Sequence, residues 1–301
     1  MSIKINFEKE NSKKASANIV LFVEEKFNNN SLFKHFSKNE LSFVKDLLKN
    51  NTSKKDFLIF ELNSKKKIIL IKIKNNQDGL ANEKLGAKFY DFIKSNEISN
   101  LTFFKQTEIK YQHVFYFDEF LHGLKLKSYE FNIYKTRKKD RTIKINIPKK
   151  ILDQTQSIRN YAIEEGVRFT KDLVSEPGNI LHPDEYAKRI TPLKKLGLKI
   201  NVYDQKKLKK LGMNALLGVG QGSIRGSYLV TMEWNGNKNA SKPLAFVGKG
   251  VCFDTGGISL KPAKFMEDMT YDMAGSAVVV GLMKSLALRK AKINAIGVVG
   301  L

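Results

Sequence analysis

Residues 247–262 read VGKGVCFDTGGISLKP, and this stretch decides how the second half of the 301-residue chain is expected to fold. The apolar residues 244–247 predict a short buried strand, and two glycine-rich turns follow it. Lys249 comes almost directly after the strand, and Asp254 precedes the second turn. Ligand-binding and catalytic side chains of open α/β sheets gather at the carboxyl ends of strands, so the stretch predicts a functional site.

Strands of the same kind are expected around this stretch. Residues 198–202 and 228–233 are short apolar runs, and helical or glycine-rich segments separate them. This pattern indicates an α/β domain with a mostly parallel sheet that is covered on both faces. The apolar run 293–301 predicts one more strand, and no turn or cap follows it. We therefore expect the sequence to stop in the middle of this domain.

The first half also alternates between strand-like and helical segments, which is an α/β pattern. Strands are expected at 16–22, 57–62, 67–74, 111–115 and 142–147, and helices at 39–49, 85–96 and 115–126. The last of these strands runs into Pro148, and a new helical pattern begins shortly after it. We therefore place a domain boundary close to Lys150.

A longer helix is expected to connect the two halves. Apolar residues recur at every third or fourth position from about 153 to 173. Glu176-Pro177-Gly178 ends this pattern, because proline lacks the amide hydrogen and glycine permits a turn. The sequence thus predicts a smaller N-terminal α/β domain over 1–150, a connecting helix over 151–175 and a second α/β domain over 176–301.

The formal net charge of +23 makes nucleic acid a partner to consider, because clustered lysine and arginine side chains neutralise phosphates. Only seven of the 53 basic residues are arginine, and the lysines are spread along the whole chain. A nucleic-acid binder concentrates its charge in one stripe and uses arginine. The composition therefore favours a solvated lysine surface, and nucleic-acid binding is the less favoured alternative.

The distribution of apolar residues and of cysteine indicates a cytoplasmic protein. The first 14 residues contain no apolar core of a signal peptide, and the most apolar stretch, 274–283, is too short to cross a bilayer. We therefore expect no membrane partner. Cys252 is the only cysteine, which fits a reducing compartment, and its apolar neighbours predict a buried small residue rather than a nucleophile.

Carboxylates near Lys249 suggest a metal site. Divalent ions need several carboxylates, and Asp254 and Asp272 can provide two of them. The segment contains no histidine, so a lysine nitrogen would have to complete the set, and a buried Lys249 could be kept neutral for that purpose. Each residue also has a simpler explanation: Asp254 in a turn, Asp272 at the start of a helix, and Lys261 in solvent.

The joint pattern resembles the leucyl (cytosol) aminopeptidase family. That family carries Val-Gly-Lys-Gly, Phe-Asp-Ser-Gly-Gly, Lys-Pro and Met-x-x-Asp-Met at fixed spacing, and all are present here with Thr255 in place of the serine. The resemblance covers roughly 110–301 and is dense after 165. Further matching stretches lie at 129–136, 171–179 and 211–223.

The resemblance implies a two-metal exopeptidase with a role for each matching residue. Lys249 and Asp272 would bind one metal ion, and Asp254 would be shared by both ions, which would be Mn²⁺ or Zn²⁺, or else Mg²⁺. Lys261 would be the catalytic residue that polarises the scissile carbonyl. Substrate binding would involve Met269, which would line the pocket for the first side chain, together with Lys261 and Asp272. A hydroxide activated by the two metals would remove leucine-type residues from peptides with a free N-terminus.

The resemblance also implies a hexamer, and it leaves one motif unmatched. The family carries a later Asn-Thr-Asp-Ala-Glu-Gly-Arg motif with further metal ligands, and this sequence does not contain it. Residues 176–301 would then be the front part of the catalytic domain, and a complementary C-terminal fragment would be a partner. The alternative is a catalytically inactive fragment that binds nucleic acid or other subunits through its basic surface.

Overall fold

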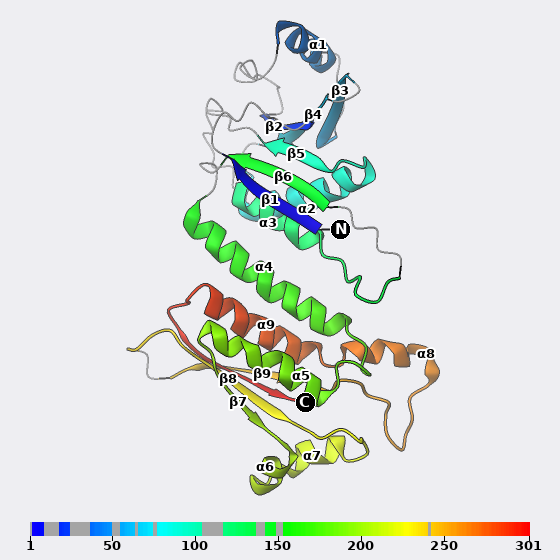
Figure 1. Cartoon of the computed structure of the whole chain (residues 1–301), viewed down its shortest axis with the longest axis vertical. Coiled ribbons are helices and arrows are strands. Elements are labelled where there is room, and N and C mark those ends of the chain that lie inside the picture. The colour runs from blue at the N-terminus through cyan, green and yellow to red at the C-terminus, as the bar shows by residue number, and fades with distance from the viewer. Residues whose placement is uncertain are drawn as a thin grey trace. The chain divides into compact units, whose positions relative to one another are not determined.

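The computed structural model describes residues 2–8, 18–24, 37–49, 55–63, 66–74, 77–103, 117–136, 142–148, 153–239 and 242–301. The chain divides into two compact units, residues 1–157 and 158–301 (Figure 1). The division falls inside helix α4, Gln154–Ser175, which is the helix expected between the two halves. α4 ends directly before Glu176, as predicted. The assignment of 1–150 and 176–301 as domains stays a prediction.

The first unit is built on a six-stranded sheet with the order β1-β6-β5-β2-β4-β3. Its strands are β1 (Ser2–Glu8), β2 (Asn18–Glu24), β3 (Phe57–Asn63), β4 (Lys66–Ile73), β5 (Asn100–Phe103) and β6 (Thr142–Pro148). Every neighbouring pair is parallel except β3 and β4. Two strands were not predicted: β1, in which apolar residues alternate with polar ones as in a half-buried strand, and β5, which has only four residues. The strand expected at 111–115 lies outside the described residues.

Three helices in the described part of the first unit confirm the helical predictions there. They are α1 (Lys38–Lys49), α2 (Gly79–Ser95) and α3 (Phe117–Lys127). α2 begins earlier than predicted because Asp78 caps it: the Asp78 carboxylate accepts a hydrogen bond from the Ala81 amide at 2.7 Å.

Two glycines let α2 and α3 cross at backbone contact distance. A Cβ at Gly86 would lie 1.8 Å from the Phe120 carbonyl oxygen, and one at Gly123 would lie 1.9 Å from the Glu83 carbonyl oxygen. Phe120, at this crossing, is fully buried and packs edge-on against Phe22 of β2. The helix crossing therefore sets the position of the aromatic core of the first unit.

The second unit contains a four-stranded sheet with the order β7-β8-β10-β9. The strands are β7 (Lys199–Tyr203), β8 (Leu229–Asn235), β9 (Leu244–Lys249) and β10 (Asn294–Gly300), all close to their predicted places. β9 and β10 are parallel, whereas β8 is antiparallel to both β7 and β10.

The α/β fold class is confirmed, but the expectation of a mostly parallel sheet in the second unit is wrong for the described strands. Only one of the three pairings there is parallel. An apolar run indicates that a strand is covered, and it does not indicate the direction of the strand relative to its neighbours. β7 and β8 also alternate between buried and more exposed residues, as antiparallel strands do.

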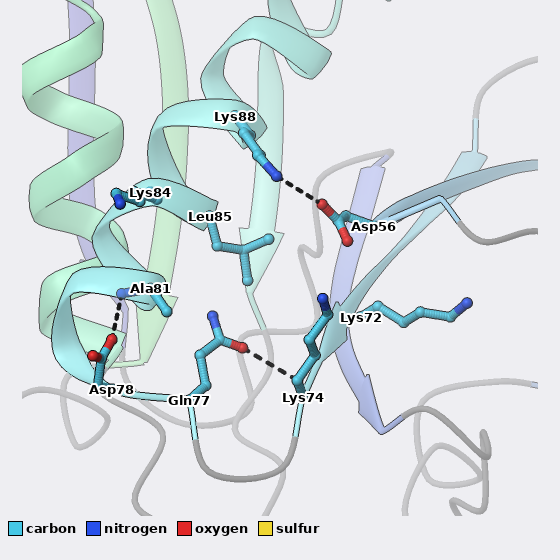
Figure 2. A pocket seen from close by; sticks show the side chains of 9 residues that line it. All are labelled: Asp56, Lys72, Lys74, Gln77, Asp78, Ala81, Lys84, Leu85 and Lys88. Atoms are coloured by element: carbon cyan, nitrogen blue, oxygen red, sulfur yellow. Dashed lines mark hydrogen bonds and ion pairs between the residues drawn. The ribbon is translucent and has the colours of Figure 1, made fainter.

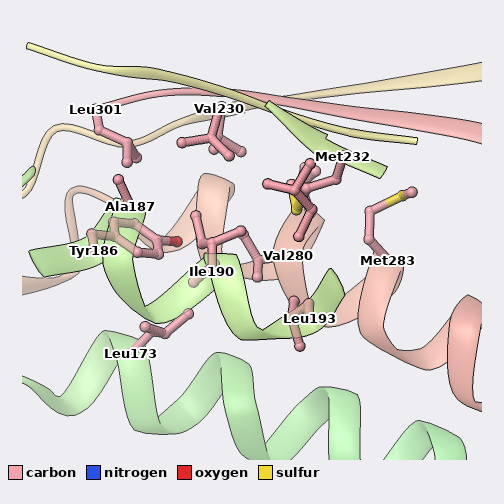
Figure 3. Packing of buried hydrophobic residues seen from close by; sticks show 14 of the residues in the cluster. Leu173, Tyr186, Ala187, Ile190, Leu193, Val230, Met232, Val280, Met283 and Leu301 are labelled. Atoms are coloured by element: carbon pink, nitrogen blue, oxygen red, sulfur yellow. The ribbon is translucent and has the colours of Figure 1, made fainter. Parts of the chain in front are cut away.

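The helical elements of this unit besides α4 are α5 (Pro183–Ile190), η3 (Thr191–Leu196), α6 (Gln205–Lys210), α7 (Asn214–Gly220), α8 (Ala263–Met266), η4 (Glu267–Tyr271) and α9 (Ala274–Leu288). Of these, α5 and α9 cover one face of the sheet, with α4 as a second layer (Figures 1 and 3). α5 and α9 lie between the sheet and α4, and their apolar side chains meet those of β8, as Ile190, Val280 and Met232 show (Figure 3). Gly166 of α4 and Gly281 of α9 allow close contact, because a Cβ at Gly166 would lie 2.5 Å from the Gly281 carbonyl oxygen.

One helical segment, residues 263–288, is long and apolar enough by length and composition to cross a membrane. It is not one straight helix, because Lys264 and Phe265 have non-helical backbone angles and η4 separates α8 from α9. α9 itself has 15 residues, and nine of them are buried in the core of the second unit. We therefore assign α9 as a core helix.

We expect Gly86→Ala to destabilise the first unit. The added methyl group would force α2 and α3 apart, and overpacking of this kind costs about 1–3 kcal/mol or more. Gly79→Ala is the matched control in the same helix, because its Cβ would come no closer than 3.6 Å to its nearest neighbour, Glu119. Urea unfolding followed by circular dichroism measures both variants. Equal midpoints for the two variants would show that the helix crossing is not tight.

Candidate functional site

A tight loop brings Lys261 back to Asp254. One Asp254 oxygen accepts a hydrogen bond from the Gly256 amide at 2.8 Å, and the Lys261 amide donates to the Thr255 carbonyl oxygen at 2.9 Å. Gly256 has a φ of 97°, and a Cβ there would lie 2.4 Å from the Ser259 carbonyl oxygen, so the turn requires glycine. With the loop closed in this way, Lys261 Nζ lies 2.7 Å from the second Asp254 oxygen.

A second close contact sets Asp272 beside Lys249. Lys249 is the last residue of β9, and Asp272 lies two residues before α9. A Cβ at Gly248 would lie 2.5 Å from the Ser276 Cα in the first turn of α9, so the strand and the helix touch here. As a result, Lys249 Nζ lies 2.5 Å from Asp272 Oδ1. Asp272 does not cap α9, since the cap position is Met273 and makes no side-chain cap hydrogen bond.

The two ion pairs form one cluster. The hydrogen bond from Lys261, followed by that from the Gly256 amide, lowers the pKa of Asp254, and the charge of Lys249 acts in the same direction. Asp254 is therefore ionised at neutral pH. Asp272 is the most covered of the four side chains, with 17% of its surface exposed, against 34% for Lys261.

The expectation that burial keeps Lys249 neutral is not met by the described residues. Its side chain is 59% exposed and forms an ion pair. The reason is its position on β9, which is an edge strand of the sheet. Val247, on the same face of β9, is 80% exposed. As a metal ligand, Lys249 would have to lose the proton that it now donates to Asp272.

The second Asp272 oxygen offers a place for a cation. Oδ2 is buried and has no hydrogen-bond partner among the described residues. A buried carboxylate oxygen without a partner is costly, and a divalent ion would satisfy it. Asp254 supplies a second carboxylate to the cluster. In the described part of the chain, no group of three or more His, Cys, Asp and Glu side chains could hold an ion. Asp254 and Asp272 would therefore supply only part of the ligands of a metal site.

Met269 joins the two ion pairs. Its sulfur lies 3.1 Å from Lys261 Nζ, and its carbonyl oxygen accepts a hydrogen bond from the Asp272 amide at 3.2 Å. Both contacts depend on the 3₁₀ turn η4, which ends just before Asp272. The sequence gives no signal for the contact between Met269 and Lys261, because the two side chains meet only when the intervening segment folds.

Buried side chains beneath the cluster support the start of α9. Tyr186 and Ser276 are fully buried, and their hydroxyl oxygens lie 2.9 Å apart. Ser276 also donates to the Met273 carbonyl oxygen at 2.7 Å. Sequence reasoning missed this pair, since neither residue stands out from its segment. Cys252 lies nearby and is buried as predicted, and burial raises its pKa to about 12, which is unsuited to a nucleophile.

A basic hollow of about 430 Å³ lies in the first unit, between the end of β4 and the start of α2 (Figure 2). Four lysines line it, but two aspartates line it as well, and Lys88 pairs with Asp56 at 3.2 Å. Figure 2 shows the Lys72 side chain turned away from Gln77 and Leu85. The hollow therefore gives no specific support to the nucleic-acid alternative.

Residues 168–301 match the cytosol aminopeptidase family, catalytic domain. The probable cytosol aminopeptidases of Bradyrhizobium sp. strain BTAi1 and Brucella melitensis biotype 1 are 51% and 54% identical to this chain over 185 and 187 residues. These matches cover 60% of this chain and 37% and 39% of the two relatives. The chain thus spans about two fifths of the length of these curated relatives.

Solved structures share the fold. A mutant of tomato leucine aminopeptidase has a TM-score of 0.73 and 19% identity, over 99% of this chain and 62% of that chain. The bottromycin maturation enzyme BotP in complex with Mn has a TM-score of 0.71 and 19% identity, over 95% of this chain and 59% of that one. At 19% identity these structures show a shared fold alone, and the similarity to cytosol aminopeptidases is carried by the sequence matches. Residues 168–301 are thus similar to the catalytic domain of the cytosol aminopeptidase family.

Proposed function

We propose that this chain is part of a metal-dependent aminopeptidase that removes N-terminal, leucine-type residues from peptides. The main support is the meeting of two lysine–aspartate pairs at the carboxyl end of β9, in a segment about half identical to probable cytosol aminopeptidases. The chain spans about two fifths of those relatives, so the activity is proposed for the protein of which these residues form a part.

The proposal gives each residue of the cluster a task. Lys249, Asp254 and Asp272 would hold two divalent ions, with Asp254 shared between them. Bound there, such ions would supply Lewis-acid activation of water and of the scissile carbonyl. Lys261 would donate a hydrogen bond to the carbonyl oxygen, where negative charge develops in the transition state. Asp272 would contact the free amine of the substrate, and Met269 would line the pocket for its first side chain.

Several finer features are part of the same proposal. BotP was solved with Mn, which supports Mn²⁺ among the candidate ions, alongside Zn²⁺ and Mg²⁺. The names of the relatives support a cytoplasmic location. We further propose assembly into a homo-oligomer, a hexamer by the resemblance, and additional metal donors from outside the described residues, supplied by the same protein or by a complementary fragment.

Lys261→Ala tests the catalytic assignment. We expect it to lower hydrolysis of leucine anilide, with added Mn²⁺ or Zn²⁺, by about 10²- to 10³-fold, because one charged donor to the developing oxyanion is lost. Lys264→Ala is the matched control, since Lys264 is an exposed lysine of the same segment. Equal rates for the two variants would contradict the role of Lys261. If residues 1–301 fold and bind metal but do not hydrolyse the substrate, the comparison is repeated in the longer protein of which these residues form a part, and no hydrolysis there would contradict the proposed function.

Asp272→Asn tests the metal assignment without any need for turnover. We expect Mn²⁺ affinity, measured by the loss of the free-ion electron paramagnetic resonance signal, to fall at least about tenfold, because a charged ligand becomes a neutral amide. Asp268→Asn serves as the control, because Asp268 is an exposed carboxylate in η4, the 3₁₀ turn directly before Asp272. If both variants bind Mn²⁺ like the parent protein, Asp272 is not a ligand.

A further inference from the structure

We propose that Met269 is a positioning residue that aims the Lys261 ammonium group at the substrate carbonyl, a role that rests on the proposed aminopeptidase function. The ammonium group has three N–H donors in tetrahedral directions. One points to Asp254 Oδ2 at 2.7 Å, and a second points to the Met269 sulfur at 3.1 Å. With two donors held, the direction of the third is fixed, and this third donor is the one that can reach a ligand.

Neither partner is sufficient by itself. A single hydrogen bond to Asp254 would leave the ammonium group free to rotate about that bond. The methionine sulfur is a weak acceptor, but the backbone from which its side chain extends is held in place, because the Met269 carbonyl oxygen accepts a hydrogen bond from the Asp272 amide. Met269 therefore contacts both ion pairs, Asp272 through its backbone and Lys261 through its sulfur. The position of the Lys261 ammonium group is thereby linked to that of Asp272, the partner of Lys249.

A side chain that only fills space would behave differently from one that accepts a hydrogen bond. Leucine has nearly the volume of methionine and contains no acceptor, so Met269→Leu keeps the packing and removes the contact. Glutamine is similar in length and carries an acceptor oxygen, so Met269→Gln keeps the contact at the expense of apolar packing. If Met269 only fills space, Met269→Gln should be the more impaired variant. If Met269 accepts a hydrogen bond, Met269→Leu should be the more impaired one.

The experiment measures how fast acetic anhydride labels Lys261, by mass spectrometry of the folded protein, relative to Lys264 in the same molecule. We expect Met269→Leu to raise this ratio about 2- to 10-fold, which corresponds to the loss of one hydrogen bond. Met269→Gln should stay within about twofold of the parent protein on the same scale. Met266→Leu is the matched control, because Met266 is a partly buried methionine of the same segment with no hydrogen bond to a lysine among the described residues.

The hydrolysis assay adds a second readout. We expect Met269→Leu to lower kcat for leucine anilide more than it changes KM, and Met269→Gln to restore most of kcat. The opposite order, with the leucine variant like the parent and the glutamine variant impaired in labelling and in kcat, would overturn the positioning role. Labelling needs no turnover. The expected labelling pattern in a protein without hydrolysis would therefore count against the proposed function and leave the contact standing.

Discussion

The geometry of the site depends on the direct contact between the end of β9 and the first turn of α9. Gly248 makes this contact possible, since any side chain there would enter the backbone of Ser276. The Ser276 hydroxyl in turn forms a hydrogen bond with the buried Tyr186 hydroxyl. Asp272 precedes α9 and Lys249 ends β9, so the distance between their charged groups follows from a packing contact between a strand and a helix.

The four charged side chains of the cluster balance one another in formal charge. Two carboxylates face two ammonium groups, so the four side chains carry no net charge, and each lysine stands where a positive ion is favourable. A divalent ion would compete with Lys249 for the oxygens of Asp272, and it would bind best if that lysine lost its proton. Two carboxylates would be too few to balance two divalent ions, so the proposed two-metal site would need further anionic donors.

Local sequence patterns predicted most of the elements and drew attention to Lys249, Asp254 and Asp272, whereas Lys261 was singled out only by the resemblance to the aminopeptidase family. Apolar runs identified β4 and β9, and Glu176-Pro177-Gly178 marked the end of α4. The direction of β8 could not be predicted, because apolar composition reports burial and not strand orientation. The pairing of Lys261 with Met269 was equally hidden, since it depends on the Gly256 turn and the 3₁₀ turn together.

One face of β9 links two observations that look separate. Val247 and Lys249 alternate with the buried Gly248, so their side chains lie on the same face, and both are exposed, Val247 at 80% and the Lys249 side chain at 59%. Both exposures follow if a further element packs on this face in the whole protein. Such an element would bury Val247 and exclude water from Lys249, next to the Asp272 oxygen that has no partner among the described residues.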